Sequence, residues 1–443
     1  MEKIAKFFKF EERGTNFKTE TLAGVTTFMT MAYVLATQPG SICGFGAEAG
    51  ITDSAGVFIA KEAIVVTCAL ITSIITLLMG FYTNYPFALS TGMGINFVLG
   101  ALVQAGTISY AAAMGIILIE GIIFLALSVF GIRDLIVRMI PKNIKVSIGT
   151  AIGFFIAYLG FKNSGICDFS AGLSAGDFTQ RSVQFALIGL GLIAVLTAFK
   201  VKGAILIGII AITILGIPFG VTTVPSTIAK LPDWSSLGNI VFRFDLKSIM
   251  NAQGIVLIFI AFFGDFFSTL GTVLAVGSRA HMLDENGNLP EIQKPFVVDA
   301  IGTVVGACFG CTTITTYVES TAGVEAGGRT GWTAITVGIL FFIFIFLSPL
   351  ALMVPNAATG PALIFVGFLM IQGIKDIDFS DFTEAFGPFV MIVFGAYSAS
   401  IAGGIAAGIL AYIFIKVFTG KFKDVNVGMY ILAIPLVLYF VLG

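Results

Sequence analysis

The chain has 443 residues, of which 57% are hydrophobic and only 11% are charged, and its formal net charge is −1. A soluble domain carries roughly 25% charged residues, and the mean hydropathy of +1.01 lies far outside that class. This balance excludes an ordinary soluble domain and gives no support for nucleic-acid binding. Apolar runs of about 20 residues, each long enough to cross a bilayer core, recur from end to end. The sequence therefore predicts an all-α polytopic membrane protein.

The first 20 residues differ from the rest of the chain. The stretch MEKIAKFFKFEERGTNFK is amphipathic and basic, and it lacks the apolar core and small-residue cleavage site of a signal peptide. We expect residues 1–20 to form a cytoplasmic segment at the membrane surface. Basic residues in 133–145 and at Lys200 and Lys202 fall on the same side when the spans are counted. Positive loops face the cytoplasm, so a multi-pass protein of the cell membrane with a cytoplasmic N-terminus is predicted.

Apolar windows bounded by charges and helix breakers predict about 14 membrane spans, seven on each side of a polar linker. The spans are expected near 21–43, 57–80, 86–103, 109–130, 145–163, 181–199, 201–220, 253–278, 295–311, 315–326, 330–353, 358–374, 384–399 and 401–419. A final apolar run, 427–443, either crosses the membrane or lies along it. Two halves with an odd number of spans must have opposite orientations, which predicts a 7+7 inverted repeat.

Spans 3 and 10 occupy matching places in the two halves, and both are interrupted. YPFALSTGMGINF (85–97) contains a Pro, two close glycines and the polar Asn96. TTITTYVESTAGVEAGG (312–328) contains four threonines before Glu319, and a fifth threonine and small residues after it. Each pattern predicts a short extended segment that leads into a half-helix. Paired interruptions of this kind indicate a transporter binding site near the bilayer midplane, and Glu319 is the strongest candidate for contact with a ligand.

Other acids lie inside predicted spans, where a charge is costly and is functional by default. Asp265 is the single charge within 254–277, and Ser268 is expected on roughly the same helical face. A role in substrate or ion coupling is favoured for Asp265. Glu120 and Asp299 do not lie on interrupted spans, so we expect them to tie helices together. Thr27, in the first span, either bonds a neighbouring helix or contacts the ligand.

These motifs resemble those of the adenine/guanine/hypoxanthine permeases, the azaguanine-type branch of the nucleobase–cation symporter-2 superfamily. The resemblance rests on ETLAGVTTFMTMAYVL (20–35), PFALSTGMGIN (86–96), TTYVESTAGVEAGGRTG (315–331) and IKDIDFSDFTEA (374–385), among other blocks. It implies a core domain that moves against a gate domain. The expected boundaries are 21–132 (core, spans 1–4), 133–221 (gate, spans 5–7), 222–250 (extracytoplasmic linker), 251–354 (core, spans 8–11) and 355–443 (gate, spans 12–14 and the C-terminal segment).

The resemblance also implies a function, which is import of a purine base by proton symport with an elevator-type mechanism. The base would bind between spans 3, 8 and 10, with no cofactor or metal, and a homodimer through the gate domain is expected. The resemblance matches Glu319 and Asn96 to family residues of the tenth and third spans. Together with our interpretation of the spans, the residues predicted at the substrate are Glu319, Asn96, Ser268, Thr27, Thr316, Ser320 and Phe97. Proton coupling is predicted for Asp265 and Glu319.

Departures from the family pattern keep alternatives open. The eighth span usually carries two acids, and here GDFFSTLGT (264–272) has Asp265 and then Ser268. Thr91 replaces a Pro, and Phe97 replaces an Ala. The alternative is therefore a transporter of the same fold for another small planar or anionic substrate, with different or no proton coupling. A channel or a scaffold is less consistent with the buried acids. We expect no enzyme, because no nucleophile–base pair, metal-ligand cluster or phosphate loop is present.

Overall fold

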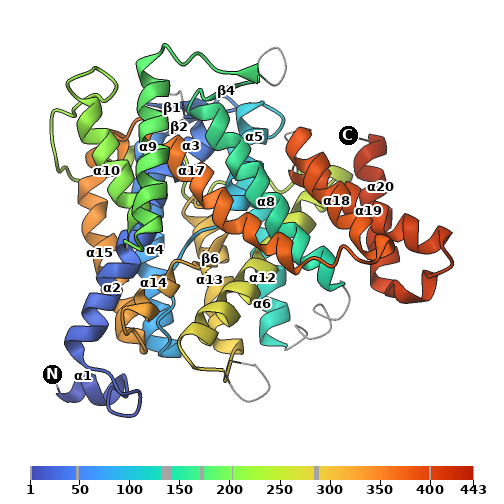
Figure 1. The fold of residues 1–443 in the computed structure, drawn as a ribbon, viewed down its shortest axis with the longest axis horizontal. Coiled ribbons are helices and arrows are strands. Elements are labelled where there is room, and N and C mark those ends of the chain that lie inside the picture. The colour runs from blue at the N-terminus through green and yellow to red at the C-terminus, as the bar shows by residue number, and fades with distance from the viewer. Residues whose placement is uncertain are drawn as a thin grey trace.

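The computed structural model describes residues 2–45, 49–130, 141–169, 174–201, 203–283, 289–398 and 401–442, and most of these are helical (Figure 1). Among them, seven helices are long and apolar enough to cross a membrane, and shorter apolar helices accompany these. The predicted all-α membrane fold is confirmed, while the exact number of crossings stays a prediction. The predicted boundary at 132/133, Lys202 and most of the basic stretch 133–145 lie outside the described residues.

The elements follow the predicted order of spans. The first half contains α1 (Glu2–Phe7), α2 (Phe17–Met31), α3 (Val34–Cys43), β1 (Gly50–Thr52), β2 (Phe58–Ala60), α4 (Lys61–Thr83), β3 (Leu89–Thr91), α5 (Met93–Gln104), α6 (Tyr110–Val129), α8 (Lys142–Asn163), β4 (Cys167–Asp168), β5 (Ser174–Ala175), α9 (Arg181–Ala198) and α10 (Ala204–Gly216). After α11 (Trp234–Leu237), the second half contains α12 (Ala252–Arg279), α13 (Gln293–Cys308), β6 (Ile314–Thr316), α14 (Ser320–Glu325), α15 (Gly331–Phe344), η1 (Ile345–Leu347), α16 (Ser348–Leu352), α17 (Asn356–Ile371), η2 (Gln372–Asp376), α18 (Phe382–Tyr397), α19 (Ile401–Phe418), η3 (Phe422–Asp424) and α20 (Val427–Leu442).

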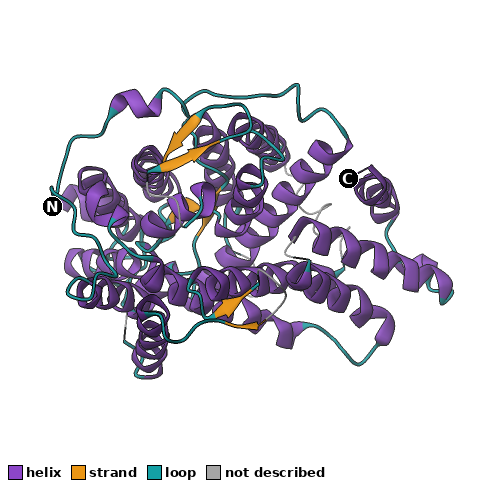
Figure 2. Ribbon diagram, turned by 90° about the horizontal axis from the view of Figure 1, so that it is seen from above, coloured by secondary structure: helices purple, strands orange, loops and turns teal. Residues whose placement is uncertain are grey.

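The interrupted spans 3 and 10 meet as a buried two-stranded antiparallel sheet. Strand β3 pairs with β6 in the register Leu89↔Thr316, Ser90↔Thr315 and Thr91↔Ile314. The pairing extends beyond the two strands, because the backbone N–H of Gly92 donates to the carbonyl of Thr313 at 2.7 Å. Extended backbone at membrane depth must be satisfied by protein, and here each strand satisfies the other. The half-helices α5 and α14 follow directly, which confirms the predicted break in both spans. Figure 2 shows this and the other short two-stranded ribbons among the helices.

The helices pack in two groups. In one group α4 contacts α15 and α3, α6 contacts α13 and α12, and α2 contacts α15 and α14. In the other, α17 packs on α8 and α9, and α18 packs on α8 and α19. Small residues allow close contact there: a Cβ on Gly367 of α17 would lie 2.6 Å from the carbonyl of Gly153 on α8. These groups are those assigned to core and gate, and their movement as separate bodies stays a prediction.

The N-terminal segment packs on the first group, whereas the C-terminal helix contacts both groups. Phe8 and Phe10, after α1, are buried against Ile335 of α15, and the N-terminus lies at the lower left of Figure 1. The apolar run at 427–443, whose placement the sequence leaves open, forms α20 over its described part and packs against α12 and α19. The first span, expected as one helix over 21–43, is two helices with a break at Ala32 and Tyr33. This break places Tyr33 beside the turn that precedes α14.

Candidate functional site

Glu319 lies in the turn between β6 and α14, and its carboxyl group is held from span 1. The hydroxyl of Tyr33 donates to Glu319 Oε1 at 2.8 Å, and the hydroxyl of Thr30 donates to the Glu319 carbonyl at 3.3 Å. Among the described residues, no hydrogen bond reaches Glu319 Oε2. Glu319 is partly exposed, and Val318 beside it is 49% exposed. The carboxyl group is therefore held through Oε1, and Oε2 is left to accept a further hydrogen bond.

Asn96 lies in the first turn of α5, where it contacts span 1 and is fully buried. Its Nδ2 donates to Gln38 Oε1 of α3, which also accepts from the hydroxyl of Thr91 at 3.0 Å. Asn96 Oδ1 is buried without a hydrogen-bond partner. Sequence reasoning missed Gln38, although a polar amide inside an apolar run was a signal for it. Phe97, next along α5, is buried and stacks on Phe45 with ring centroids 6.2 Å apart.

The remaining residues predicted at the substrate have different contacts. Thr27 is buried at the contact of α2 with α14, where a Cβ on Gly323 would lie 2.1 Å from Thr27 Oγ1. The hydroxyl of Ser320 accepts from the backbone N–H of Ala88 at 3.0 Å, so it braces β3. The hydroxyl of Thr316 donates to the buried Asp299 at 3.0 Å. Of the residues predicted at the substrate, only Glu319 and Ser268 are not buried.

Asp265 and Ser268 have different surroundings in α12, although their spacing suggested a shared face. Asp265 is buried, and its Oδ2 accepts from the hydroxyl of Thr303 on α13 at 3.3 Å. Ser268 is exposed on a helix that also packs against α14. One turn beyond Asp265, the hydroxyl of Thr269 donates to Asp299 Oδ2 at 2.9 Å. The buried face of α12 therefore faces other acids, and Ser268 lies outside that cluster.

Arg329, in the G-G-R-T-G part of the span 10 motif, helps to form the junction of α14 with α15. Its guanidinium donates to the carbonyls of Val324 and Gly328 at 2.6 and 2.7 Å. The buried Glu20 of α2 accepts from the N–H groups of Arg329 and Thr330 at 2.8 and 3.2 Å. Glu20 thus supplies acceptors for N–H groups at the start of α15, which an interrupted helix leaves open. Sequence reasoning did not identify Glu20.

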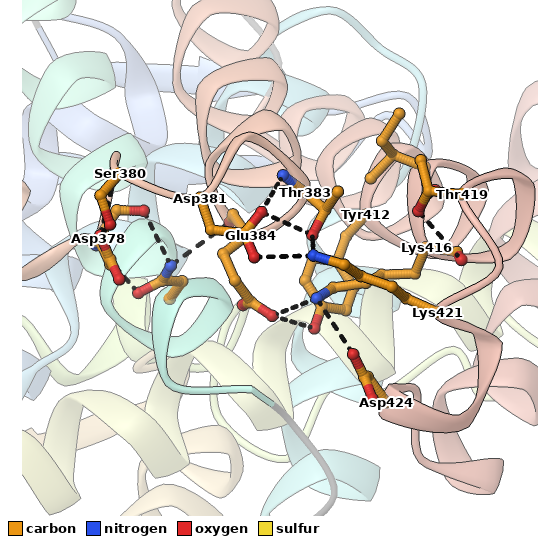
Figure 3. Close-up of polar contacts among 12 residues, drawn as sticks. Asp378, Ser380, Asp381, Thr383, Glu384, Tyr412, Lys416, Thr419, Lys421 and Asp424 are labelled. Carbon is orange, nitrogen blue, oxygen red and sulfur yellow. Dashed lines mark hydrogen bonds and ion pairs between the residues drawn. The ribbon is translucent and has the colours of Figure 1, made fainter.

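A second polar cluster lies far from Glu319 in the chain, on α18, α19 and η3 (Figure 3). The ammonium of Lys416, 2% exposed, lies 2.5 Å from Glu384 and 3.7 Å from Asp424. Nearby, Lys421 donates to Asp381 at 2.9 Å, and this contact, followed by those from Thr383, holds the pKa of Asp381 well below its usual range.

This second cluster includes the motif at 374–385 and joins the gate helices to one another. Asn143, at the start of α8, donates to the carbonyls of Asp378 and Glu384 at 3.3 and 3.4 Å. It also accepts from the Asp378 N–H at 3.2 Å. Because each carboxylate here has a lysine or a local hydrogen-bond donor beside it, the cluster has the character of a helix-joining network.

Comparison with known proteins identifies the family. A family model described as the permease family matches residues 18–400. The archaeal chain MJ0326 of Methanocaldococcus jannaschii is 39% identical, covering 100% of this chain and 99% of its own. The adenine permease AdeP of Escherichia coli K12 is 35% identical (98% of this chain, 95% of that one), and the guanine/hypoxanthine permease PbuG of Bacillus subtilis is 34% identical (98% and 99%).

Solved structures support the fold. The transmembrane domain of the cyanobacterial bicarbonate transporter BicA superposes with a TM-score of 0.59 at 16% identity, covering 88% of this chain and 97% of that one. SLC26A9 gives 0.59 at 12% identity, over 90% and 65%. These structures share the predicted 7+7 inverted-repeat fold. The relatives are named as permeases and not as enzymes, as expected. The chain therefore belongs to the permease family and is a multi-pass membrane transporter.

Proposed function

We propose that the protein imports a purine nucleobase, and that Glu319 recognises it. Relatives that match nearly the whole chain are named adenine permease and guanine/hypoxanthine permease. The observation that carries the proposal is the Glu319 carboxyl, fixed through Oε1 by Tyr33 and open at Oε2. Purines present ring and exocyclic N–H donors that a carboxylate can accept. A buried site built to accept such bonds discriminates strongly against molecules that lack them.

We propose further that uptake is coupled to protons and proceeds by an elevator-type movement of the core against the gate. The division of the helices into two packed groups supports the movement. Buried acids beside the strand that leads to Glu319 support the coupling. The same proposal includes a cytoplasmic N-terminus, residence in the cell membrane and a homodimer through the gate domain.

The alternative is a different small planar or anionic substrate, and Ser268 is the observation that favours it. This exposed residue of α12 stands where the family pattern has an acid. Loss of one negative charge beside the ligand changes which hydrogen-bond donors the site can accept. The proton could then be absent or replaced by another coupling ion.

The test is uptake of labelled hypoxanthine into proteoliposomes with and without an inward proton gradient, with adenine, guanine, xanthine and uracil as competitors. Gradient-stimulated uptake that purines block supports the proposal. Glu319→Gln is expected to abolish uptake, while Glu12→Gln, the same change at an exposed residue, keeps it. Absence of purine uptake by well-folded protein would overturn the proposal and favour the alternative substrate.

A further inference from the structure

Three acids from three helices meet beside strand β6, and none of them belongs to the residues predicted at the substrate, although Asp265 was assigned to proton coupling. They are Glu120 on α6, Asp265 on α12 and Asp299 on α13, with exposed fractions of 0%, 2% and 0%. Among the described residues, no Lys, Arg or His forms an ion pair with any of them. A buried carboxylate without a cation is costly unless it is hydrogen-bonded or protonated. These carboxyl groups must therefore be stabilised by hydrogen bonds from hydroxyl groups or neutralised by protonation.

The hydrogen bonds divide these three acids into one satisfied carboxyl and two incomplete ones. Asp299 accepts from Thr269 at 2.9 Å and from Thr316 at 3.0 Å, one bond to each oxygen. Glu120 accepts from Thr313 at Oε2, at 3.1 Å. Asp265 accepts from Thr303 at Oδ2. Glu120 Oε1 and Asp265 Oδ1 are buried without any donor.

The two incomplete carboxyls are each other's neighbours. The side chains of Glu120 and Asp265 lie within hydrogen-bonding reach of each other, so the oxygens without a donor belong to two neighbouring acids. Two carboxylates in contact repel each other, and neither can donate. One proton held between them satisfies both oxygens and lowers the buried charge by one. Asp299 on α13 is a further titratable group that interacts with both acids, and the threonines beside the pair are Thr303 on α13 and Thr313 and Thr315 at β6.

The same three helices also pack against one another through an aromatic layer, which lies one helical turn from Glu120 in α6 and next to Asp265 in the sequence of α12. Phe124 of α6, Phe266 of α12 and Phe296 of α13 are buried, with ring centroids 5.6 to 5.9 Å apart. Such packing excludes water and strengthens electrostatic interactions beside it. A proton on the pair is therefore not in free contact with solvent in this conformation.

The acid pair is also bonded to the strand that carries Glu319. Thr313, which donates to Glu120, has its carbonyl bonded to the Gly92 N–H of the β3 side. The Thr303 hydroxyl accepts from the backbone N–H of Ile314 in β6 at 3.2 Å, and it shares its single hydrogen between Asp265 Oδ2 at 3.3 Å and the Ile314 carbonyl at 3.0 Å. Loss of the proton would drive the two carboxylates apart, and both are tied to β6. A protonation change at the pair can thus shift the strand that positions the ligand-binding carboxyl.

We propose that Glu120 and Asp265 hold one proton between Glu120 Oε1 and Asp265 Oδ1, and that this is the proton coupled to transport. The coupling part rests on the function proposed above. It assigns a role in coupling to Glu120, which its sequence position did not suggest, and it moves coupling away from Glu319. Substrate and proton then occupy separate sites joined by β6.

Infrared spectroscopy of the purified, substrate-free protein tests the shared proton directly through the carbonyl band of a protonated carboxyl. We expect the wild type to show this band at neutral pH, and Glu120→Gln and Asp265→Asn each to remove it. The amide introduced at either position can donate to the remaining carboxylate, so the contact and the fold are retained. The matched changes Glu319→Gln and Glu12→Gln should leave the band in place. Its persistence in both Glu120→Gln and Asp265→Asn, or its loss in Asp299→Asn alone, would overturn the proposal.

Transport then tests the coupling. With the membrane potential clamped at zero, an inward gradient of one pH unit can drive about tenfold accumulation per proton. We expect Glu120→Gln to bind hypoxanthine like the wild type but to show no gradient-driven accumulation. Accumulation equal to the wild type would overturn the coupling role. If the wild type takes up no purine, the proposed function fails, whereas the infrared band still decides whether the pair shares a proton.

Discussion

Two groups of acids in this molecule, one partly exposed and one buried, are stabilised in opposite ways. In the gate helices, Glu384 lies 2.5 Å from the ammonium of Lys416, and Asp381 lies 2.9 Å from that of Lys421 (Figure 3). Beside β6, Glu120, Asp265 and Asp299 have threonine hydroxyls as donors, and no cation of the described residues pairs with them. An ion pair fixes the charge of its carboxylate, whereas a carboxyl among hydroxyls can still gain or lose a proton. The ion-paired arrangement suits a fixed connection between helices, and the hydroxyl-bonded arrangement suits a site that changes its protonation state.

The largest expected effect on hypoxanthine binding is that of Glu319→Gln, a substitution that lies outside both acid clusters. Glu319→Gln replaces the open carboxyl oxygen with an amide of the same shape, and a hydrogen bond to a charged group contributes about 1.5–3 kcal/mol. We expect hypoxanthine binding to weaken by roughly 10- to 100-fold, with thermal stability near that of the wild type. Equilibrium binding of labelled hypoxanthine and a melting curve measure the two quantities. Unchanged affinity would show that Glu319 does not contact the base.

Lys416→Met should have the converse effect, on stability and not on binding. Removing the buried ammonium leaves Glu384 without its cation, but Glu384 is 29% exposed and Asp424 is 57% exposed. Solvent therefore reduces the loss of a buried pair to about 1–3 kcal/mol. A lower melting temperature with unchanged hypoxanthine affinity is the expected result. If hypoxanthine affinity falls while the melting temperature stays that of the wild type, the cluster around Lys416 does more than join helices.

Tyr33→Phe removes the hydroxyl that orients Glu319 and leaves the ring in place. Because Glu319 stays available to the ligand, the loss should be smaller than for Glu319→Gln, roughly 3- to 10-fold in affinity. The same substitution at Tyr430, whose hydroxyl bonds the Phe422 carbonyl in the gate, is the matched control. Equal affinity of Tyr33→Phe and wild type would mean that Tyr33 does not position the carboxyl.

Ser268→Asp restores an acid at the exposed position of α12 where the family pattern has one. We expect a severalfold shift in the ratio of purine affinities, with total uptake of the same order. Competition of labelled hypoxanthine by adenine, guanine and xanthine measures the shift. An unchanged competition profile would show that Ser268 does not face the ligand.

The smallest effect concerns the outer ion pair of the gate. Lys421 lowers the pKa of Asp381 in the folded state, so the stabilisation is present above the unfolded value, about 3.9. It is lost as the pH falls toward the lower folded value. The melting temperatures of Asp381→Asn and wild type should therefore differ slightly at neutral pH and converge below about pH 4. A difference that grows on acidification would contradict the ion pair.

The breaks in spans 3 and 10 could be predicted from sequence because Pro86, the TGMG turn and the intramembrane acid at Glu319 are local signals. The contacts that these residues make could not be predicted from the sequence. Tyr33 and Glu319 are 286 residues apart, and their pairing depends on a break in span 1 that the apolar pattern does not reveal. Glu20 lies at the start of an apolar run, and nothing in that local sequence predicts its hydrogen bonds to the start of α15. Spacing also suggested one face for Asp265 and Ser268, whereas packing against α6 and α13 gives them different surroundings.

The most direct measurement is a cryo-electron microscopy structure of the protein with hypoxanthine bound. We predict density for the base at the turn between β6 and α14, with a purine N–H within hydrogen-bond distance of Glu319 Oε2. The base should not contact Glu120 or Asp299. A base bound away from Glu319, or held directly by the acids beside β6, would contradict the separation of ligand and proton sites.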